Sequence, residues 1–260
     1  MTGARPTPRR IDTHGTNCWI YVPADGSETG VSAEIAAETA AEIAAETAVS
    51  RGAGGSHGAR KPCFLIDPGA CPDDIIRNVE RLNLYPTHIL LTHGHFDHIG
   101  ALPDVAAYYG NQGIQTIAIH EADALYLGKD SRDAHRRCWS AAAGNADYIE
   151  AHWKPQPDPT LPLRDGDRVG SLRILHVPGH TPGSAAFFDE EARVLFSGDC
   201  LFKNAIGRTD LPGGDARLIR DSLNRLFALG DDIMVYPGHG GTTVIGAERR
   251  FYGGAFPGDL

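Results

Sequence analysis

The sequence has no excess of basic residues, which argues against a nucleic-acid partner. Its 260 residues carry 24 Lys and Arg against 33 Asp and Glu, a formal net charge of −9 at pH 7. Residues 24–50 hold six of the acids and neither Lys nor Arg, so much of the negative charge is local. The charge therefore says little about the substrate, and the lack of a basic patch disfavours a nuclease.

Long apolar runs and a cysteine framework are also missing. No apolar run approaches the roughly 18 residues that a membrane-spanning helix needs, so we expect no membrane partner. The basic residues 1–10 are not followed by the apolar segment of a secretory signal. The five cysteines are an odd number without framework spacing, which predicts reduced thiols and a cytoplasmic protein.

Apolar side chains, at 42% of the chain, are numerous enough for a sizeable core. We expect residues 1–260 to form one domain with a low-complexity insertion at about residues 24–61. Within the insertion, Ala-Glu-Ile-Ala-Ala-Glu-Thr-Ala at 33–40 recurs at 41–48. Alanine favours helix, but the glutamates repel one another and two isoleucines form no adequate buried stripe. We therefore predict an exposed segment, partly helical or disordered, within a hairpin.

Outside the insertion, short apolar runs alternate with helical patterns. The runs predict strands at 17–22, 63–66, 88–91, 116–119, 172–177, 185–188, 193–196 and 233–236. Helices are expected at 73–82 and 99–109, with 121–153 mostly helical or irregular. A further helix at 217–229 is expected to bury Leu218, Leu223, Leu226 and Phe227 on one face. This order predicts a layered α/β protein with sheets inside and helices outside.

The segment Thr92-His-Gly-His-Phe-Asp-His98 is the densest group of metal-binding side chains, and it follows an apolar run directly. Imidazole and carboxylate are ligands that zinc prefers. Alternation along a strand end places His93 and His95 on one side of the backbone. Asp97 and His98 can then face a second point nearby, so one short loop could serve two metal ions.

Three further loops carry His or Asp after an apolar strand. They are Pro178-Gly-His-Thr-Pro-Gly183, Ser197-Gly-Asp199 and Pro237-Gly-His-Gly240. Loops at one edge of a sheet are where sites are commonly built, and glycine permits tight turns there. The four segments together predict a metal site.

These segments resemble the metallo-β-lactamase fold superfamily, and most closely its glyoxalase II-like (hydroxyacylglutathione hydrolase) members of the compact single-domain bacterial branch. The resemblance rests on 92–98, 178–183, Ser197-Gly-Asp-Cys-Leu-Phe202, Ile206-Gly-Arg-Thr-Asp-Leu-Pro-Gly-Gly214 and Tyr236-Pro-Gly-His239. It implies an αβ/βα four-layer sandwich with the site between the sheet edges.

The resemblance also implies two divalent metal ions, with zinc as the first expectation and iron or manganese as alternatives. The implied ligands are His93, His95 and His180 for one ion, Asp97, His98 and His239 for the other, and Asp199 between them. Asp67 matches an aspartate that would accept a ligand imidazole N–H, although a simple turn residue before proline is the alternative. Cys200 is expected to be packed, because strand alternation turns it away from Asp199.

Two metal ions would generate metal-bound hydroxide near neutral pH and polarise a carbonyl, with Asp97 and Asp199 as the catalytic carboxylates. This chemistry predicts hydrolysis of an activated acyl bond, and the family resemblance implies a small-molecule thioester such as S-2-hydroxyacyl-glutathione. The alternatives are a mononuclear iron persulfide dioxygenase, which shares the Gly-Arg-Thr-Asp element at 207–210, and a lactonase or other hydrolase of this fold.

The chain departs from classical glyoxalase II in two respects. It ends about twenty residues after His239, so we expect no C-terminal glutathione-binding domain. The segment that carries a lysine and a tyrosine in the classical enzymes reads Gly207-Arg-Thr-Asp210 here. Arg208 could bind a substrate carboxylate, or it could be a structural partner of Asp210.

Overall fold

The computed structural model describes residues 6–23, 60–110, 114 and 116–252. The predicted insertion at about 24–61 lies outside the described residues except for its last two positions. The strands that flank it, β2 and β3, pair antiparallel, as a hairpin requires. Lys61 is already the first residue of β3, so the insertion ends slightly earlier than predicted.

Two six-stranded sheets form the centre of the molecule. The first has the order β1-β2-β3-β4-β5-β6 and consists of Arg9–Thr13, Thr16–Tyr21, Lys61–Ile66, Leu84–Leu91, Thr116–His120 and Leu161–Leu163. The second has the order β14-β13-β10-β9-β8-β7 and consists of Thr243–Val244, Met234–Pro237, Val194–Gly198, Ala185–Asp189, Leu172–His176 and Arg168–Val169. A small hairpin, β11 (Leu201–Phe202) and β12 (Ala205–Ile206), follows β10.

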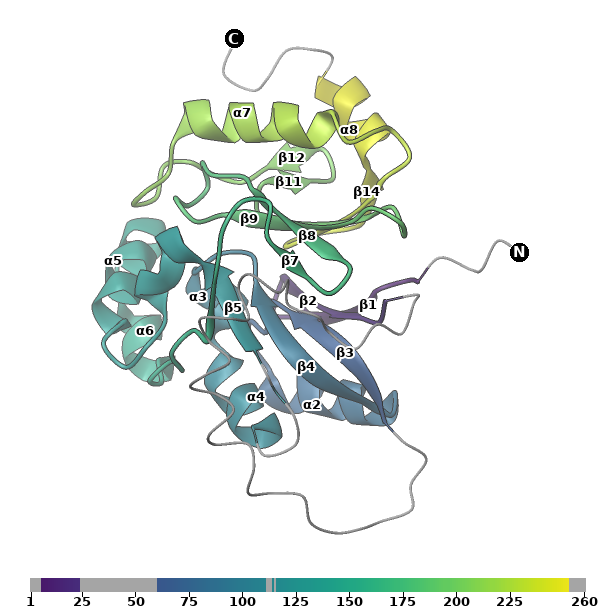
Figure 1. Cartoon of the computed structure of the whole chain (residues 1–260). Coiled ribbons are helices and arrows are strands. Elements are labelled where there is room, and N and C mark those ends of the chain that lie inside the picture. Colours follow the sequence, from purple (N-terminus) through teal and green to yellow (C-terminus); the bar gives the residue numbers. More distant parts are fainter. Residues whose placement is uncertain (1–5, 24–59, 111–113, 115, 253–260) are drawn as a thin grey trace.

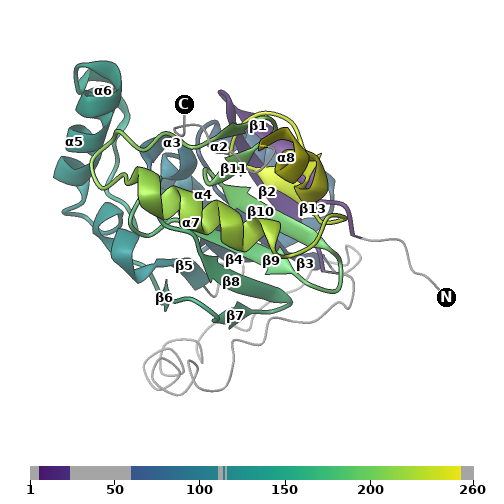
Figure 2. The same ribbon diagram turned by 90° about the horizontal axis from the view of Figure 1, so that it is seen from above.

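Helices cover the outer faces of both sheets (Figure 1). The helices on the first sheet are α2 (Pro72–Arg81) and α4 (Leu102–Tyr109), and α3 (Phe96–Ile99) precedes α4. The helices on the second sheet are α7 (Ala216–Phe227) and α8 (Ile245–Tyr252), which lie across it when the molecule is seen from above (Figure 2). The 3₁₀ helix η2 (Glu121–Tyr126), α5 (Arg132–Ala143) and α6 (Asp147–His152) follow β5, and α5 and α6 lie at one end of the sandwich (Figure 1).

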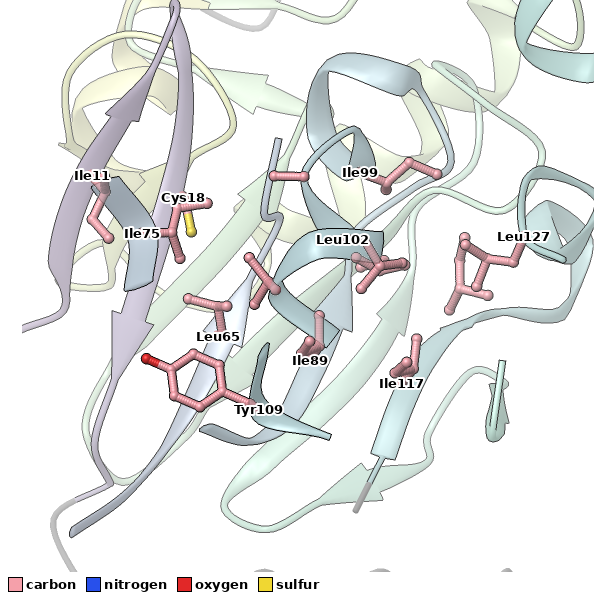
Figure 3. Close-up of a cluster of buried hydrophobic side chains, with 14 of the residues drawn as sticks. Ile11, Cys18, Leu65, Ile75, Ile89, Ile99, Leu102, Tyr109, Ile117 and Leu127 are labelled. Carbon is pink, nitrogen blue, oxygen red and sulfur yellow. The ribbon is translucent and has the colours of Figure 1, made fainter. Parts of the chain in front are cut away.

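The buried side chains sort into three layers because strand residues alternate between faces. Leu65 of β3 packs with the residues of α2 and α4 in the cluster shown in Figure 3. Its neighbours Phe64 and Ile66 belong to the layer between the two sheets. Leu195 of β10 packs with α7 and α8 in the third layer. The predicted four-layer sandwich is confirmed.

Two local predictions were wrong. Leu218 is 43% exposed, and the buried face of α7 consists of Ile219, Ser222, Leu223, Leu226 and Phe227. The spacing i, i+3, i+4, i+7 from Ile219 defines this face, and Leu218 lies beside it. The helix predicted at 99–109 begins only at Leu102, because Ala101 N–H donates to the carbonyls of Pro68 and Gly69 and not to a helical carbonyl.

The sequence patterns also missed several short elements. Strands β6, β7, β11, β12 and β14 have two or three residues each, too few to show alternation. Among the helices in the described part of the chain, none is long and apolar enough to cross a membrane. All five cysteines lie in described segments and are free thiols.

Candidate metal centre

Four loops carry the predicted site residues, and each follows the carboxyl end of a strand. Strands β10 and β13 are parallel neighbours, so the loops that follow them begin at the same edge of the second sheet. The loop after β4, in the first sheet, lies against the second sheet because Ala185 N–H of β9 donates to the Thr92 carbonyl at 2.8 Å. The structure brings together all seven predicted ligands: His93, His95, Asp97, His98, His180, Asp199 and His239.

The seven side chains form three overlapping groups whose ligand atoms lie within 4.8 Å of one another. The groups are His93, His95 and His180; His93, His98 and Asp199; and Asp97, His98 and His239. The first and third groups are the two sets expected from the sequence. The second group adds that His98 also lies close to His93, since their ring centroids are 4.1 Å apart.

Asp199 lies between the first and third groups. Its Oδ2 is 3.5 Å from His180 Nε2 and 3.3 Å from His239 Nε2. Its Oδ1 is 3.3 Å from His98 Nε2. One carboxylate therefore contacts imidazoles from both groups, which is the arrangement that two neighbouring cations require to offset their repulsion.

The unsatisfied atoms of the site test whether these residues fit metal ions. Among the described residues, the buried atoms without a hydrogen-bond partner include His93 Nε2, His95 Nε2, His180 Nε2 and Asp199 Oδ1. A buried polar atom left unpaired costs about 1–3 kcal/mol. All four point to one cluster and are of the type that binds divalent metals, so the residues fit a metal centre.

The electrostatics of the first group favour neutral imidazoles. Burial and then the neighbouring imidazole of His180 lower the pKa of His95 to about 3. Burial and the rings of His98 and His95 likewise lower the pKa of His93 well below its ordinary value. Neutral imidazole is the form that coordinates a metal, so these two side chains need not lose a proton to bind one.

Carboxylates dominate the third group. Burial opposes protonation of His239, but the carboxylates of Asp199 and Asp97 outweigh it and raise the pKa of this imidazole to about 10. The two acids therefore stabilise positive charge at this point. A divalent cation supplies that charge and competes with the proton for the same Nε2.

Backbone carbonyls fix the orientation of two of the candidate ligand rings. His180 Nδ1 donates to the Arg208 carbonyl at 2.7 Å, and His239 Nδ1 donates to the Gly15 carbonyl at 2.9 Å. Because a carbonyl oxygen only accepts, each Nδ1 must carry a proton. Each Nε2 is then the free coordinating atom and faces Asp199.

Asp67, which is buried, lies behind the first loop. Its Oδ1 accepts from Thr92 N–H at 2.8 Å, and its Oδ2 accepts from Thr92 Oγ1 at 2.7 Å. Oδ2 also lies 3.0 Å from His98 Nδ1. The carboxylate thus contacts Nδ1 of the candidate ligand His98, whose Nε2 faces Asp199, while Cys200 is fully buried in the layer below α7.

Two contacts of the site could not be read from sequence motifs. Thr16 Oγ1, at the start of β2, donates to Asp97 Oδ2 at 3.3 Å. Asp123, in η2, contacts the loops on both sides of the first group. Neither residue stands in a recognisable metal motif, and only the folded arrangement brings them to the site.

A cavity of about 590 Å³ opens over the cluster. Its apolar lining comes from Phe96, Trp139, Ala142, Phe202, Ile206 and Leu211. Arg208 also lines it, and its guanidinium pairs with both carboxylate oxygens of Asp210 at 2.8 Å. Arg208 is therefore paired with Asp210, which was the structural alternative to binding a substrate carboxylate. Its position at the cavity is also one that a substrate could reach.

The fold and this cluster define a metal-dependent enzyme of the metallo-β-lactamase type. Residues 58–239 match the Metallo-beta-lactamase superfamily, and the chain belongs to this superfamily. The hydroxyacylglutathione hydrolase GloC of Haemophilus influenzae is 37% identical over 192 residues, 73% of this chain and 85% of that protein. This similarity supports a hydrolase activity.

Solved structures agree with the fold. The crystal structure of TTHA1623 in a di-iron-bound form matches with a TM-score of 0.67 and 32% identity, over 94% of this chain and 98% of that chain. ETHE1 from Myxococcus xanthus matches with a TM-score of 0.57 and 25% identity, over 94% and 82% of the two chains. The resemblance inferred from the motifs is confirmed.

Proposed function

We propose that the protein is a metal-dependent thioester hydrolase with a dinuclear centre. The observation that carries the proposal is the position of Asp199, whose carboxylate contacts His180 from one group and His239 from the other. A single carboxylate so placed serves a centre with two cations better than a centre with one.

The ligand sets follow the two outer groups. His93, His95 and His180 would hold the first ion, Asp97, His98 and His239 the second, and Asp199 both. Two bound divalent ions would lower the pKa of a bound water and polarise the substrate carbonyl. Zinc suits these nitrogen and oxygen donors, and the di-iron form of TTHA1623 supports iron as an alternative, with manganese also compatible.

The protein's own groups prepare the site for that chemistry. The carboxylates of Asp97 and Asp199 offset the positive charge of the centre, and the carbonyls of Arg208 and Gly15 hold two rings in their coordinating tautomer. No cysteine or serine nucleophile is required, and burial raises the pKa of the Cys200 thiol, which keeps it unreactive.

The substrate is proposed as a small thioester such as an S-2-hydroxyacyl-glutathione. Support comes from the 37% identity to GloC and from the cavity over the cluster, whose volume suits a small molecule. A second cavity of about 650 Å³ lies next to the first, and His14 and Phe96 line both. A cytoplasmic location remains a prediction.

A mononuclear iron persulfide dioxygenase is the second candidate. The Gly-Arg-Thr-Asp element at 207–210 favours it, and such an enzyme would use the residues His93, His180 and Asp199. The third group counts against it, because Asp97, His98 and His239 form a second complete set of ligands. A lactonase or another hydrolase of this fold differs only in the substrate.

Metal content and substrate range test the proposal together. Purified protein should contain close to two ions per chain and hydrolyse S-lactoylglutathione faster than acyl-homoserine lactones. One iron per chain, with oxygen consumption on glutathione persulfide, would establish the dioxygenase instead. Preferential turnover of the lactones would retain the dinuclear hydrolase but replace the thioester.

A further inference from the structure

Asp123 is a buried carboxylate that the proposed chemistry does not use. It lies in η2, is 0% exposed, and accepts three hydrogen bonds. The donors are Gly94 N–H at 3.0 Å, Gly183 N–H at 2.7 Å and the Thr181 hydroxyl at 2.7 Å. Burial raises the pKa of this carboxyl, and the three donors oppose that rise.

These donors belong to the two loops that carry the first ligand group. Gly94 separates His93 from His95 in the loop after β4, and Thr181 follows His180 in the loop after β8. The two loops come from different sheets. The Asp123 carboxylate is therefore a direct link between the two loops that carry the first group.

The contact is close enough to require glycine at both backbone positions. A Cβ at Gly94 would overlap the ring of Tyr126, and a Cβ at Gly183 would overlap Asp123 itself. Thr181 is held in addition by Ser184, whose Oγ accepts from Thr181 N–H at 3.0 Å. The helix η2 thus fixes both loops from behind, and neither can move without breaking hydrogen bonds.

Three converging donors need a group that only accepts. A carboxylate offers two oxygens and no donor, whereas the amide of asparagine would direct N–H groups at one or more of these donors. An apolar side chain would leave three buried donors unpaired. The chemistry at this position is therefore specific for a carboxylate, beyond what packing alone demands.

We infer that Asp123 is a positioning residue that sets the spacing between His93 and His95 on one loop and His180 on the other. By setting this spacing it controls the affinity and geometry of the first metal site. The inference rests on the proposed dinuclear centre. It adds that Asp123 keeps the two loops of the buried first group in position relative to each other.

The chain provides a matched control. Asp189, at the far end of β9, is 2% exposed and also accepts three hydrogen bonds. Its donors are the Tyr21 hydroxyl at 2.6 Å, the Ser171 hydroxyl at 2.6 Å and Ala192 N–H at 2.8 Å. Asp189→Asn therefore removes a similar buried acceptor at a place without metal ligands.

The test measures cobalt(II) binding to the full chain by competition with a chelator and by visible absorption. Asp123→Asn should weaken binding at the first site, that of His93, His95 and His180, by about 10–100-fold, the usual cost of losing an outer partner of a metal ligand. Asp123→Asn should also shift the ligand-field bands of the bound cobalt.

Asp189→Asn, the control, should lower the denaturation midpoint but leave both the cobalt affinity and the spectrum unchanged.

Thr181→Val separates positioning from charge, because it removes one donor and keeps the carboxylate. It should shift the spectrum in the same direction and weaken binding less. Wild-type affinity and spectrum in both Asp123→Asn and Thr181→Val would overturn the inference, as would an equal loss in Asp189→Asn. If Asp123→Asn does not fold, Thr181→Val decides alone. Wild-type protein that takes up no cobalt would overturn the proposed function, and this inference with it.

Discussion

Thr16 and His239 pair in an isolated antiparallel bridge, although they lie near opposite ends of the chain. The bridge places the turn between β1 and β2 against the loop that carries His239. From this turn Thr16 donates to Asp97, and the Gly15 carbonyl accepts from His239 Nδ1. The side chains of Asp97 and His239 are 41% and 34% exposed, so their candidate ligand group is the more open one. The hairpin formed by β1 and β2 holds these two side chains in place.

Asn17→Ala should therefore weaken the binding of the second metal ion more than that of the first. The Asn17 amide donates to the carbonyls of Pro237 and Gly240, both at 2.9 Å, on either side of His239. Losing both bonds frees the loop, and we expect about 10–100-fold weaker binding of the second ion. Elemental analysis after dialysis should show the metal content falling from about two ions per chain towards one.

Asn78→Ala is the matched control for this change. Asn78 also donates from its amide to a backbone carbonyl, that of Asp74, but on the helix α2 away from the site. It should retain both ions. If Asn17→Ala keeps the second ion with wild-type affinity, the hairpin does not position His239.

Local chemistry explains which parts of this structure were predictable from sequence. His93, His95, Asp97 and His98 stand in one short segment, so no tertiary information was needed to group them. The sheets were predictable because runs such as 63–66 are apolar on both faces, as strands in a four-layer sandwich must be.

Contacts between distant segments explain what was missed. Asn17 and Asp123 lie in stretches without any motif, and apart from the Thr181 hydroxyl the partners named for their side chains are backbone groups. Leu218 was predicted to be buried and is exposed, for a similar reason. Which residues of α7 are buried depends on how the helix packs on the sheet, and the sequence does not give that packing. Sequence periodicity gives an apolar stripe to within about one residue position, and packing decides which edge of it is covered.

Asp199→Ala should abolish thioester hydrolysis and release at least one ion. Asp199 contacts His98, His180 and His239, so its loss affects both ligand groups. We expect kcat/KM to fall by more than the about 10–100-fold that loss of an outer contact costs. Asp231→Asn, which alters an exposed ion pair with Arg249, should leave kcat/KM and metal content unchanged. Full activity in Asp199→Ala would exclude the bridging role.

Substitutions of Arg208 and of Asp210 should differ in their effect on KM. Exposed ion pairs are weak, so a substrate carboxylate can replace Asp210 on the Arg208 guanidinium. Arg208→Ala should raise KM for S-lactoylglutathione by about tenfold, the effect of one charged hydrogen bond. Asp210→Ala frees the guanidinium and should lower KM or leave it unchanged. Equal increases of KM in both variants would show that the pair is only structural.

Trp139→Ala should reduce the preference for apolar acyl groups. The Trp139 ring lines the cavity and stacks on Tyr148 at 4.7 Å between centroids, so its position is fixed before a substrate binds. In the wild type, kcat/KM should rise along acetyl, butyryl and hexanoyl thioesters of glutathione by up to about fourfold per buried methylene. The variant should flatten this rise because it removes the apolar surface that the acyl chain covers.

Phe251→Ala, at a 57% exposed position on α8, is the control and should keep the wild-type slope. A slope unchanged in Trp139→Ala would place the acyl chain elsewhere in the cavity.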